Sequence, residues 1–294
     1  VKALKYAPAE QRNDKQLMLK SMKEGTGPQS WKLMLFGAES VQNDREVLTE
    51  AVAQDYMAMQ YASSFYDDRD FMLKAVERHG LALKYGSEDI RADPDLAYAA
   101  VKTSWRALKN VSENLRASSR IVREAVKQCW QALEYASEEL RADKDILSLA
   151  VKQSWRSLHF AAPKLRRDSG LVLMALRQHF DALQYAADEL LQDVDFMHQA
   201  VQIKGLALAY AAEKIAADRD LVLEAVRNDW RALQYADASL RSDRGVVLEA
   251  VRKHHDALKM ALPDMQTDQE LIFEAARKRP DFLRAVPESV RGDQ

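Results

Sequence analysis

Residues 132–151 read ALEYASEELRADKDILSLAV, and this stretch holds one copy of a repeat. The pair at its end, Ala150-Val151, recurs with close variants from Ala75 to Ala275 at a period of about 25 residues, within the range of known tandem repeats. An earlier copy, Ala51-Val52, lies slightly closer to the next pair than this period predicts. Before each Ala, at a constant distance, lies an Asp, replaced once by Ser118. Ten such anchors in one phase are implausible by chance, so the chain is a tandem repeat.

Each repeat begins with a pattern that predicts an α-helix of about eleven residues. Asp143 suits the N-cap, because its carboxylate can accept hydrogen bonds from the free amides of the first turn. Asp145 follows at the positive end of the helix dipole. Apolar residues at 146, 147 and 149–151 have helical spacing, and the small Ala150 lets neighbouring helices approach closely.

The second half of each repeat predicts two shorter helical pieces. A short helix carries apolar residues such as Leu158 and Phe160. A Ser followed by acids comes next, as at Ser137, and Pro163 and Pro263 take the following position in two repeats, where a missing N–H is harmless. We expect one helical turn there, leading into the next Asp cap.

The composition excludes several other classes of protein. Gly (9) and Pro (7) are scarce, which argues against a sandwich or barrel of many short strands. Hydrophobic residues make up 47% and charged residues 30%, so the chain is not disordered. The single cysteine, Cys129, excludes a disulfide framework and a Cys-rich zinc site. No apolar run is long enough to span a membrane, and we find no secretory signal peptide.

We therefore expect an all-α fold: one α-solenoid of about eleven 25-residue helical repeats, wound as a right-handed superhelix. The array contains a partial repeat at 1–13, a first repeat at 14–43 with an insertion near 23–30, ten further repeats at 44–292, and the start of another at 293–294. A solenoid needs terminal repeats with a polar outer face, and neither end has one. We expect the array to continue in a longer protein or to be covered by a partner.

The repeat resembles one catalogued as domain of unknown function 4116. Its first half is matched by Asp44 to Val52, Asp143 to Val151 and Asp218 to Val226, and its second half by Ala132 to Asp143. The resemblance implies a tandem helical repeat, common in algal and protist proteins and in some bacterial effectors, without catalytic residues. It suggests an organellar complex, photosynthetic or respiratory, as the setting.

All five tryptophans occupy one phase, four residues after the Val of the Ala-Val pair, where the resembled family often has Gly. They are Trp105, Trp130, Trp155, Trp230 and, once the insertion is counted, Trp31. The other repeats carry Tyr56, Gly80, Phe180, Gly205, His255 and Pro280. Such a row can be an aromatic strip that binds a partner or a flat ligand, or it can pack adjacent repeats together. We favour packing, although tolerance of Gly and Pro means that the position is not an obligatory core slot.

Basic residues form a second row, and Arg106, Arg156 and Arg231 follow three of the tryptophans. Repeat proteins that read RNA stack such side chains on bases, which suggests single-stranded RNA as a ligand. Against nucleic acid, the net charge is −2, and i,i+3 pairs are expected to neutralise part of the row. The row is Lys102, Lys127, Lys152, Arg177, Arg227, Arg252 and Arg277. The expected pairs are Glu124–Lys127, Glu224–Arg227, Glu249–Arg252 and Glu274–Arg277.

The histidines and the lone cysteine do not predict a metal or catalytic site. His79, His179 and His254 share a phase but stand several repeats apart, and we expect the adjacent His254 and His255 to point to different faces of a helix. Cys129 takes a variable polar position, so a nucleophilic role is not expected. The recurring acids are explained as caps, and no phosphate-binding loop occurs. We expect no enzyme, no cofactor and no metal.

The sequence thus predicts a non-catalytic helical-repeat scaffold that mediates protein–protein interaction as a peripheral or accessory subunit of a larger complex. Peripheral association with a membrane complex is compatible with the lack of a transmembrane segment. The alternatives are a single-stranded RNA-binding protein that uses the same edge, and an aromatic strip that holds a hydrophobic cofactor. The candidate partner-binding residues are Trp105, Trp130, Trp155, Trp230, Arg106, Arg156 and Arg231.

Overall fold

The computed structural model describes residues 6–25 and 29–279, and every regular element within these ranges is helical. Pro280, residues 26–28 of the predicted insertion and the partial repeat at 293–294 lie outside them. The predicted all-α repeat fold is confirmed. The long α-helices are α2 (Lys15–Glu24), α4 (Arg45–Gln54), α5 (Arg69–Arg78), α7 (Pro94–Thr103), α9 (Ser119–Gln128), α11 (Lys144–Gln153), α13 (Ser169–Leu176), α15 (Val194–Ile203), α17 (Arg219–Asn228), α19 (Arg244–Lys253) and α21 (Gln269–Lys278).

Two shorter elements follow each long helix from α2 to α19. The first is a 3₁₀ helix: η2 (Ser30–Phe36), η3 (Tyr56–Tyr61), η5 (Gly80–Tyr85), η6 (Trp105–Asn110), η7 (Trp130–Tyr135), η8 (Trp155–Phe160), η9 (Phe180–Tyr185), η10 (Gly205–Tyr210), η11 (Trp230–Tyr235) and η12 (His255–Met260). The second is a short α-helix: α3 (Glu39–Gln42), α6 (Glu88–Ala92), α8 (Glu113–Arg116), α10 (Glu138–Arg141), α12 (Pro163–Arg166), α14 (Asp188–Leu191), α16 (Glu213–Ala216), α18 (Ala238–Arg241) and α20 (Pro263–Gln266). A further short helix, α1 (Ala9–Arg12), precedes α2.

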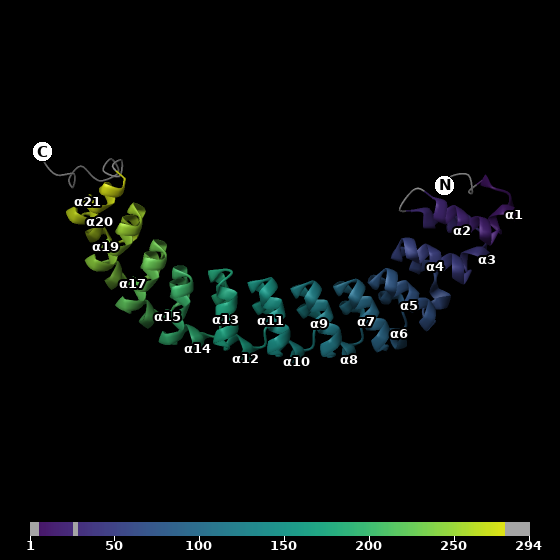
Figure 1. The fold of residues 1–294 in the computed structure, drawn as a ribbon, viewed down its shortest axis with the longest axis horizontal. Coiled ribbons are helices and arrows are strands. Elements are labelled where there is room, and N and C mark those ends of the chain that lie inside the picture. Colours follow the sequence, from purple (N-terminus) through teal and green to yellow (C-terminus); the bar gives the residue numbers. More distant parts are fainter. Residues whose placement is uncertain (1–5, 26–28, 280–294) are drawn as a thin grey trace. The chain divides into compact units, whose positions relative to one another are not determined.

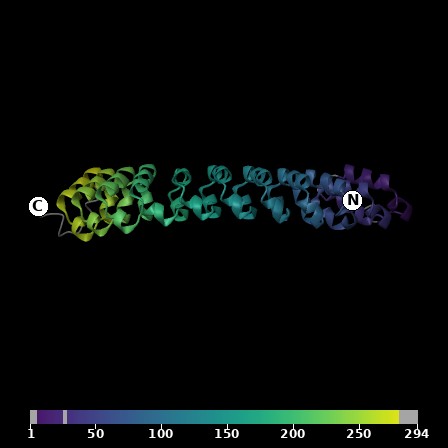
Figure 2. The same ribbon diagram turned by 90° about the horizontal axis from the view of Figure 1, so that it is seen from below.

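The chain divides into two compact halves, Val1–Gln153 and Ser154–Gln294, which we describe separately. In the N-terminal half, α5, α7 and α9 pack side by side, each against the next (Figure 1). In the C-terminal half, α15, α17, α19 and α21 do the same. Within each half the short α-helices lie along the margin opposite the row of long helices (Figure 1). Figure 2 shows the same repeats from below.

The predicted Asp caps begin the long helices. Asp143 accepts hydrogen bonds from the backbone N–H groups of Asp145 (2.8 Å) and Ile146 (3.0 Å). Each of these hydrogen bonds satisfies a backbone N–H group of the first turn that has no partner inside the helix. The predicted Pro163 and Pro263 also lie at the start of α12 and α20. The other capping residues are Asp14, Asp44, Asp68, Asp93, Asp168, Asp193, Asp218, Asp243 and Asp268.

Among the described long helices, α9 alone begins without a side-chain cap, because Ser118 makes no such hydrogen bond. Ser118→Asp should therefore raise the free energy of unfolding by about 0.5–1 kcal/mol, since the longer carboxylate reaches the free amides as its counterparts do. Urea unfolding measures the gain. Asp143→Ser, the reverse change at an existing cap, is the matched control and should cost stability. Equal stability of all three proteins would contradict the cap assignment.

Several cap carboxylates also bind a basic residue of the preceding repeat. Asp243 accepts from Arg219 Nε at 2.9 Å, and Asp93 from Arg69 Nε at 2.7 Å. The hydrogen bond from Arg219 lowers the pKa of the Asp243 carboxyl. It outweighs burial, which acts in the opposite direction, and the hydrogen bond from the N–H of Val246 adds to it. Ion pairs of this type therefore join successive long helices at their N-terminal ends.

This lowered pKa predicts how stability depends on pH. A carboxyl whose folded-state pKa lies below its unfolded value contributes stability at pH values above the unfolded pKa, and that stability is lost as the pH falls through the folded pKa. We therefore expect the urea concentration at the midpoint of unfolding to decrease as the pH is lowered from about 5 to about 3. Asp243→Asn keeps a capping oxygen but cannot titrate, so this variant should show a shallower fall. Identical pH profiles for the two proteins would contradict the assignment.

The predicted short helix is a 3₁₀ helix. In η7 the N–H of Ala132 donates to the carbonyl of Cys129, three residues earlier, which is the 3₁₀ pattern. Its Ala132 and Leu133 are fully buried beside Ala125 and Val126 of α9, which are also fully buried. In the C-terminal half the recurring Ala-Val and Ala-Leu pairs belong to one continuous hydrophobic core, which runs from Val172 to Ala275. The repeat that is one residue shorter has a three-residue 3₁₀ helix, η4 (Ser63–Phe65), at the place where the other described repeats have a short α-helix.

Backbone hydrogen bonds also connect successive repeats at the short α-helices. The N–H of Ser137 donates to the carbonyl of Arg116 (3.1 Å), and that of Asp237 to the carbonyl of Ala216 (2.9 Å). Equivalent bonds recur in both halves. In the described ranges, no helix has the length and apolar character needed to cross a lipid bilayer.

Candidate functional site

The predicted tryptophan row lies where each long helix passes into a 3₁₀ helix. We call the residue before each 3₁₀ helix together with its first two residues the 3₁₀ edge. The tryptophans on it differ in exposure. Trp155 is 9% exposed, whereas Trp105, Trp130 and Trp230 are half-buried. Trp31, in η2, is buried.

Two of these tryptophans stack on a histidine of the following repeat. The ring of Trp155 lies parallel to that of His179 at a centroid distance of 5.4 Å. The Trp230 and His254 rings are 4.5 Å apart and inclined by 11°. Offset stacking of this kind stabilises the contact beyond simple burial. At these two positions the row packs one repeat against the next.

The three predicted arginines are exposed but differ in what they contact. Arg106 and Arg156 each place the guanidinium over the ring of the preceding Trp, 4.5 Å from its centroid, a cation–π arrangement. Arg231 instead binds Asp229, with Nη2 at 2.7 Å from Oδ2. This bond, which outweighs the effect of burial, lowers the pKa of the Asp229 carboxyl.

A row of side-chain amides joins the repeats beside the tryptophans, and our sequence analysis missed it. Gln128 donates from Nε2 to the carbonyl of Val101 (2.7 Å), and its Oε1 accepts from the N–H of Trp105 (2.9 Å). It therefore satisfies a carbonyl at the end of one long helix and an amide at the start of the next 3₁₀ helix. Gln153 and Asn228 form the same bridge in other repeats. The recurrence of these amides in one phase of the repeat was the available signal.

The side chain before the 3₁₀ helix caps it at η3, η8, η9, η11 and η12. Asp229 accepts from the N–H of Arg231 (3.0 Å), and His179 Nδ1 from that of Asp181 (3.2 Å). Ser154 accepts from the N–H of Arg156 at 3.3 Å. His79, Ser104, Cys129 and Lys204 make no such bond, so capping explains the polar residue at this position in only some repeats.

The predicted charge pairs on the long helices are only partly correct. Glu124–Lys127 (3.3 Å) and Glu274–Arg277 (3.6 Å) form as expected. Arg227, however, pairs with Glu249 of the next repeat (3.3 Å). Glu224 binds His198 (2.8 Å) and Gln202 (2.7 Å), and Arg227 adds only a weaker electrostatic effect on it. Neither Glu224–Arg227 nor Glu249–Arg252 is among the close ion pairs of the described residues, contrary to our expectation. Side chains of the neighbouring repeat lie within reach, and they compete with the i,i+3 position.

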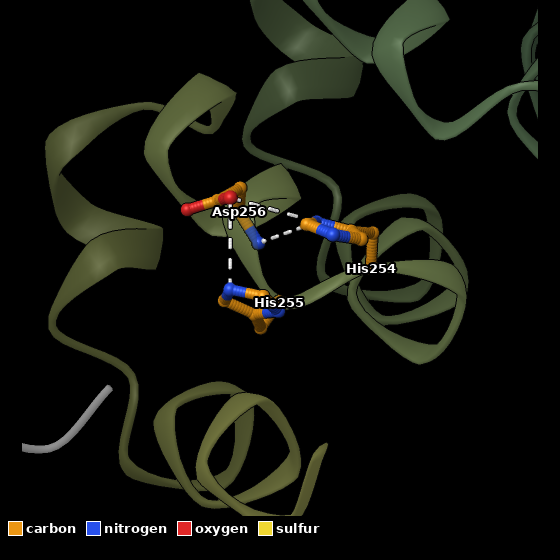
Figure 3. A group of neighbouring side chains, drawn as sticks. All are labelled: His254, His255 and Asp256. Carbon is orange, nitrogen blue, oxygen red and sulfur yellow. Dashed lines mark hydrogen bonds and ion pairs between the residues drawn. The ribbon is translucent and has the colours of Figure 1, made fainter. Parts of the chain in front are cut away.

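His254 and His255 lie on the same side of the chain, contrary to our expectation (Figure 3). Their rings stack with centroids 4.3 Å apart, because His254 caps η12 in an extended conformation and is not inside a helix. Together with Asp256, their possible ligand atoms fall within 4.8 Å of one another.

The same geometry gives each of these atoms another partner. His254 Nδ1 accepts from the N–H of Asp256 (3.2 Å), His255 Nε2 lies 3.3 Å from Arg279 Nη1, and Asp256 binds Lys259 (2.5 Å). A metal must lie in the plane of each imidazole that binds it, and the planes of stacked rings do not converge on one point. The absence of a metal therefore stays a prediction, and the cluster extends the Trp230 stack.

Gly205 interrupts the aromatic row and lies in a hollow of about 490 Å³. An added Cβ would stand 2.4 Å from the carbonyl oxygen of Ala225, so the backbone of η10 packs directly on α17. Residues of three successive repeats line the hollow, among them His179, Phe180, Lys204, Asn228, Asp229 and Arg231.

Comparison with known families gave six tandem matches to the model described as domain of unknown function 4116, at residues 68–116, 120–166, 168–216, 193–241, 218–266 and 243–291. These ranges cover more than half of the chain. The chain belongs to this family. Its last four matches begin at positions 168, 193, 218 and 243, which reproduces the period of the repeat. Neither curated proteins nor solved structures gave a match.

The 3₁₀ edge therefore belongs to a repeat of the domain of unknown function 4116 family. The description of this family states no activity. In this member, the edge position carries Gly at Gly80 and Gly205 and an aromatic residue in most other repeats. The hollow at Gly205 is thus a local departure within a regular array.

Proposed function

We propose that the chain is a non-catalytic repeat scaffold that binds another protein through its 3₁₀ edge, as a peripheral subunit of a larger assembly. One observation carries this proposal: the buried positions repeat almost unchanged, whereas the edge of the C-terminal half differs from one repeat to the next. In the C-terminal half the edge reads Ser154-Trp155-Arg156, His179-Phe180-Asp181, Lys204-Gly205-Leu206, Asp229-Trp230-Arg231 and His254-His255-Asp256. Such variation on a constant core is typical of repeat proteins whose surface recognises a partner.

The non-catalytic part of the proposal is supported by the bonds that the recurring polar side chains make. The Asp caps, of which Asp218 is one, accept backbone amides of the long helices. The bridging amides, such as Gln128, join neighbouring repeats. These groups stabilise the array, and we assign recognition to the edge. There, Trp and Arg are the types most enriched in binding hot spots.

Single-stranded RNA is a second candidate ligand. The stacked pairs Trp105–Arg106 and Trp155–Arg156 present flat surfaces of the kind that stack on bases. The edge also carries Asp181, Asp229 and Asp256, which would repel phosphates. Protein therefore remains the favoured partner. RNA binding would weaken steeply with salt through release of counterions, whereas binding to a protein should depend less on salt.

Isolation of the tagged chain from its source tests the proposal. A specific protein partner should co-purify with the wild type and be recovered less with Arg106→Glu/Arg156→Glu, which reverses charge at two exposed edge positions. Lys164→Glu, on the opposite margin in α12 and also exposed, is the matched control and should keep the partner. A chain that purifies as a lone monomer, or equal recovery with all three proteins, would contradict the proposal.

A further inference from the structure

We propose that the hollow at Gly205 receives an aromatic side chain of the partner protein, with a carboxylate next to it in the partner sequence. This inference rests on the proposed function and specifies what the edge recognises. It follows from three features of the hollow: a missing ring, a built-in gap and an unbalanced positive charge.

The missing ring is evident from the neighbouring repeats. Trp155 covers His179 of the following repeat, and Trp230 covers His254. Two equivalent positions lie between them, Phe180 and Gly205, and Gly205 supplies no ring that could cover Asp229. Phe180 on the preceding repeat is half-buried, and its ring lies 4.9 Å from that of His179. A partner ring that entered the hollow would meet these two rings and restore the stacking seen on either side of the gap.

The gap is built into the backbone. Gly205 cannot gain a side chain without displacing the carbonyl of Ala225 or the N–H of Asp229, which would lie 2.4 and 2.8 Å from a Cβ. Asn228 stabilises this close contact, because its Oδ1 accepts a hydrogen bond from the N–H of Gly205 at 2.9 Å. The volume of about 490 Å³ lies within the range of sites that bind small ligands, about 300–1,000 Å³. One aromatic side chain with its neighbouring group fits such a space.

The charges of the hollow favour an acidic neighbour. Arg231 is neutralised by Asp229 in a two-point contact of 3.0 and 2.7 Å. Lys204 also lines the hollow, and within residues 6–25 and 29–279 no ion pair is found for it. Its ammonium is therefore left to bind a carboxylate of the partner. One lysine without an ion pair suits a single carboxylate better than the run of phosphates along a nucleic acid strand, which is why we choose a protein.

Peptides titrated into the full chain test this proposal, with NMR line broadening as the readout. The probes are acetyl-Asp-Trp-Asp-amide, acetyl-Lys-Trp-Lys-amide, with the same ring and opposite charge, and acetyl-Asp-Ala-Asp-amide, which lacks the ring. We expect the acidic Trp peptide to bind at least about fivefold more tightly than the other two. Phe180→Ala should weaken it about two- to tenfold, the range expected for an aromatic pair.

Charge reversal separates the hollow from general attraction. Lys204→Glu should make the basic Trp peptide the tighter binder. The matched control is Lys214→Glu, an exposed lysine on α16, which should leave the order unchanged. Equal binding of the three peptides, no binding, or an unchanged order in Lys204→Glu would overturn the proposal. The proposal would also be overturned if none of the peptides bound, while single-stranded RNA bound to the wild type and not to Lys204→Glu.

Failure of this inference can be told apart from failure of the proposed function. If a native partner still co-purifies with Phe180→Ala/Lys204→Glu at wild-type yield, the hollow is not its binding site and the scaffold proposal stands. If no partner co-purifies with the wild type, the scaffold proposal fails.

Discussion

Trp155→Ala is expected to lower the free energy of unfolding by about 3–5 kcal/mol, the largest effect of any single edge substitution. The Trp155 side chain is 9% exposed. It stacks on His179, and its ring centroid lies 6.0 Å from that of Tyr185. Removal of the Trp155 ring leaves a cavity between two repeats, and His179 loses the ring on which it stacks. Urea unfolding followed by far-UV circular dichroism gives the change.

The matched control for this substitution is Trp105→Ala. Trp105 holds the same position in its repeat but is half-buried, and Arg106 lies over its ring. Its removal should cost about 1–2 kcal/mol, because less apolar area returns to water. Similar losses at both positions would mean that burial does not set the role of each tryptophan. If Trp155→Ala cost nothing, the packing interpretation of the row would be wrong.

Gly80→Ala is expected to cost about 2–3 kcal/mol, the upper part of the range for overpacking. The new Cβ would stand 2.1 Å from the carbonyl oxygen of Ala100. That oxygen belongs to the backbone of α7, so relief requires η5 and α7 to move apart. This spreads the cost over the contact between two repeats and cannot be avoided by a change of rotamer.

The same substitution at Gly170 is the control for Gly80→Ala. A Cβ at Gly170 meets only the cap oxygen of Asp168 at 3.3 Å, and Gly170 lies in the first turn of α13. Gly170→Ala should raise stability by about 0.5–1 kcal/mol, since Ala loses less conformational freedom in a helix. Thermal or urea unfolding of both variants provides the comparison. Destabilisation at both sites would argue against a steric cause at Gly80.

Much of the fold could be predicted because its signals are local. An Asp cap acts on the first turn of its own helix, as Asp143 does on Ile146, and the constant phase of the repeat makes each copy support the others. The proline at the start of α12 also acts locally, through its own missing N–H. Caps, long helices and short turns were therefore within reach of the sequence.

The features that were missed depend on contacts between repeats. Gln128 bonds to Trp105 and Val101 of the preceding repeat, and Arg227 reaches Glu249 rather than Glu224. Sequence spacing cannot rank such competitors, because the choice depends on how closely neighbouring helices stack. His254 and His255 were misplaced for a related reason: one caps η12 and the other begins it, so helical geometry does not apply to the pair.

The amide bridges also bear on how an array of this kind changes in length. Each bridging side chain belongs to one repeat and satisfies groups of the repeat before it, as Gln153 does for Val126 and Trp130. A duplication of one whole repeat therefore brings a new acceptor, a new donor and the side chain that joins them. A gene can gain or lose whole copies while every remaining junction stays hydrogen-bonded, provided that the copy at the junction carries Gln or Asn.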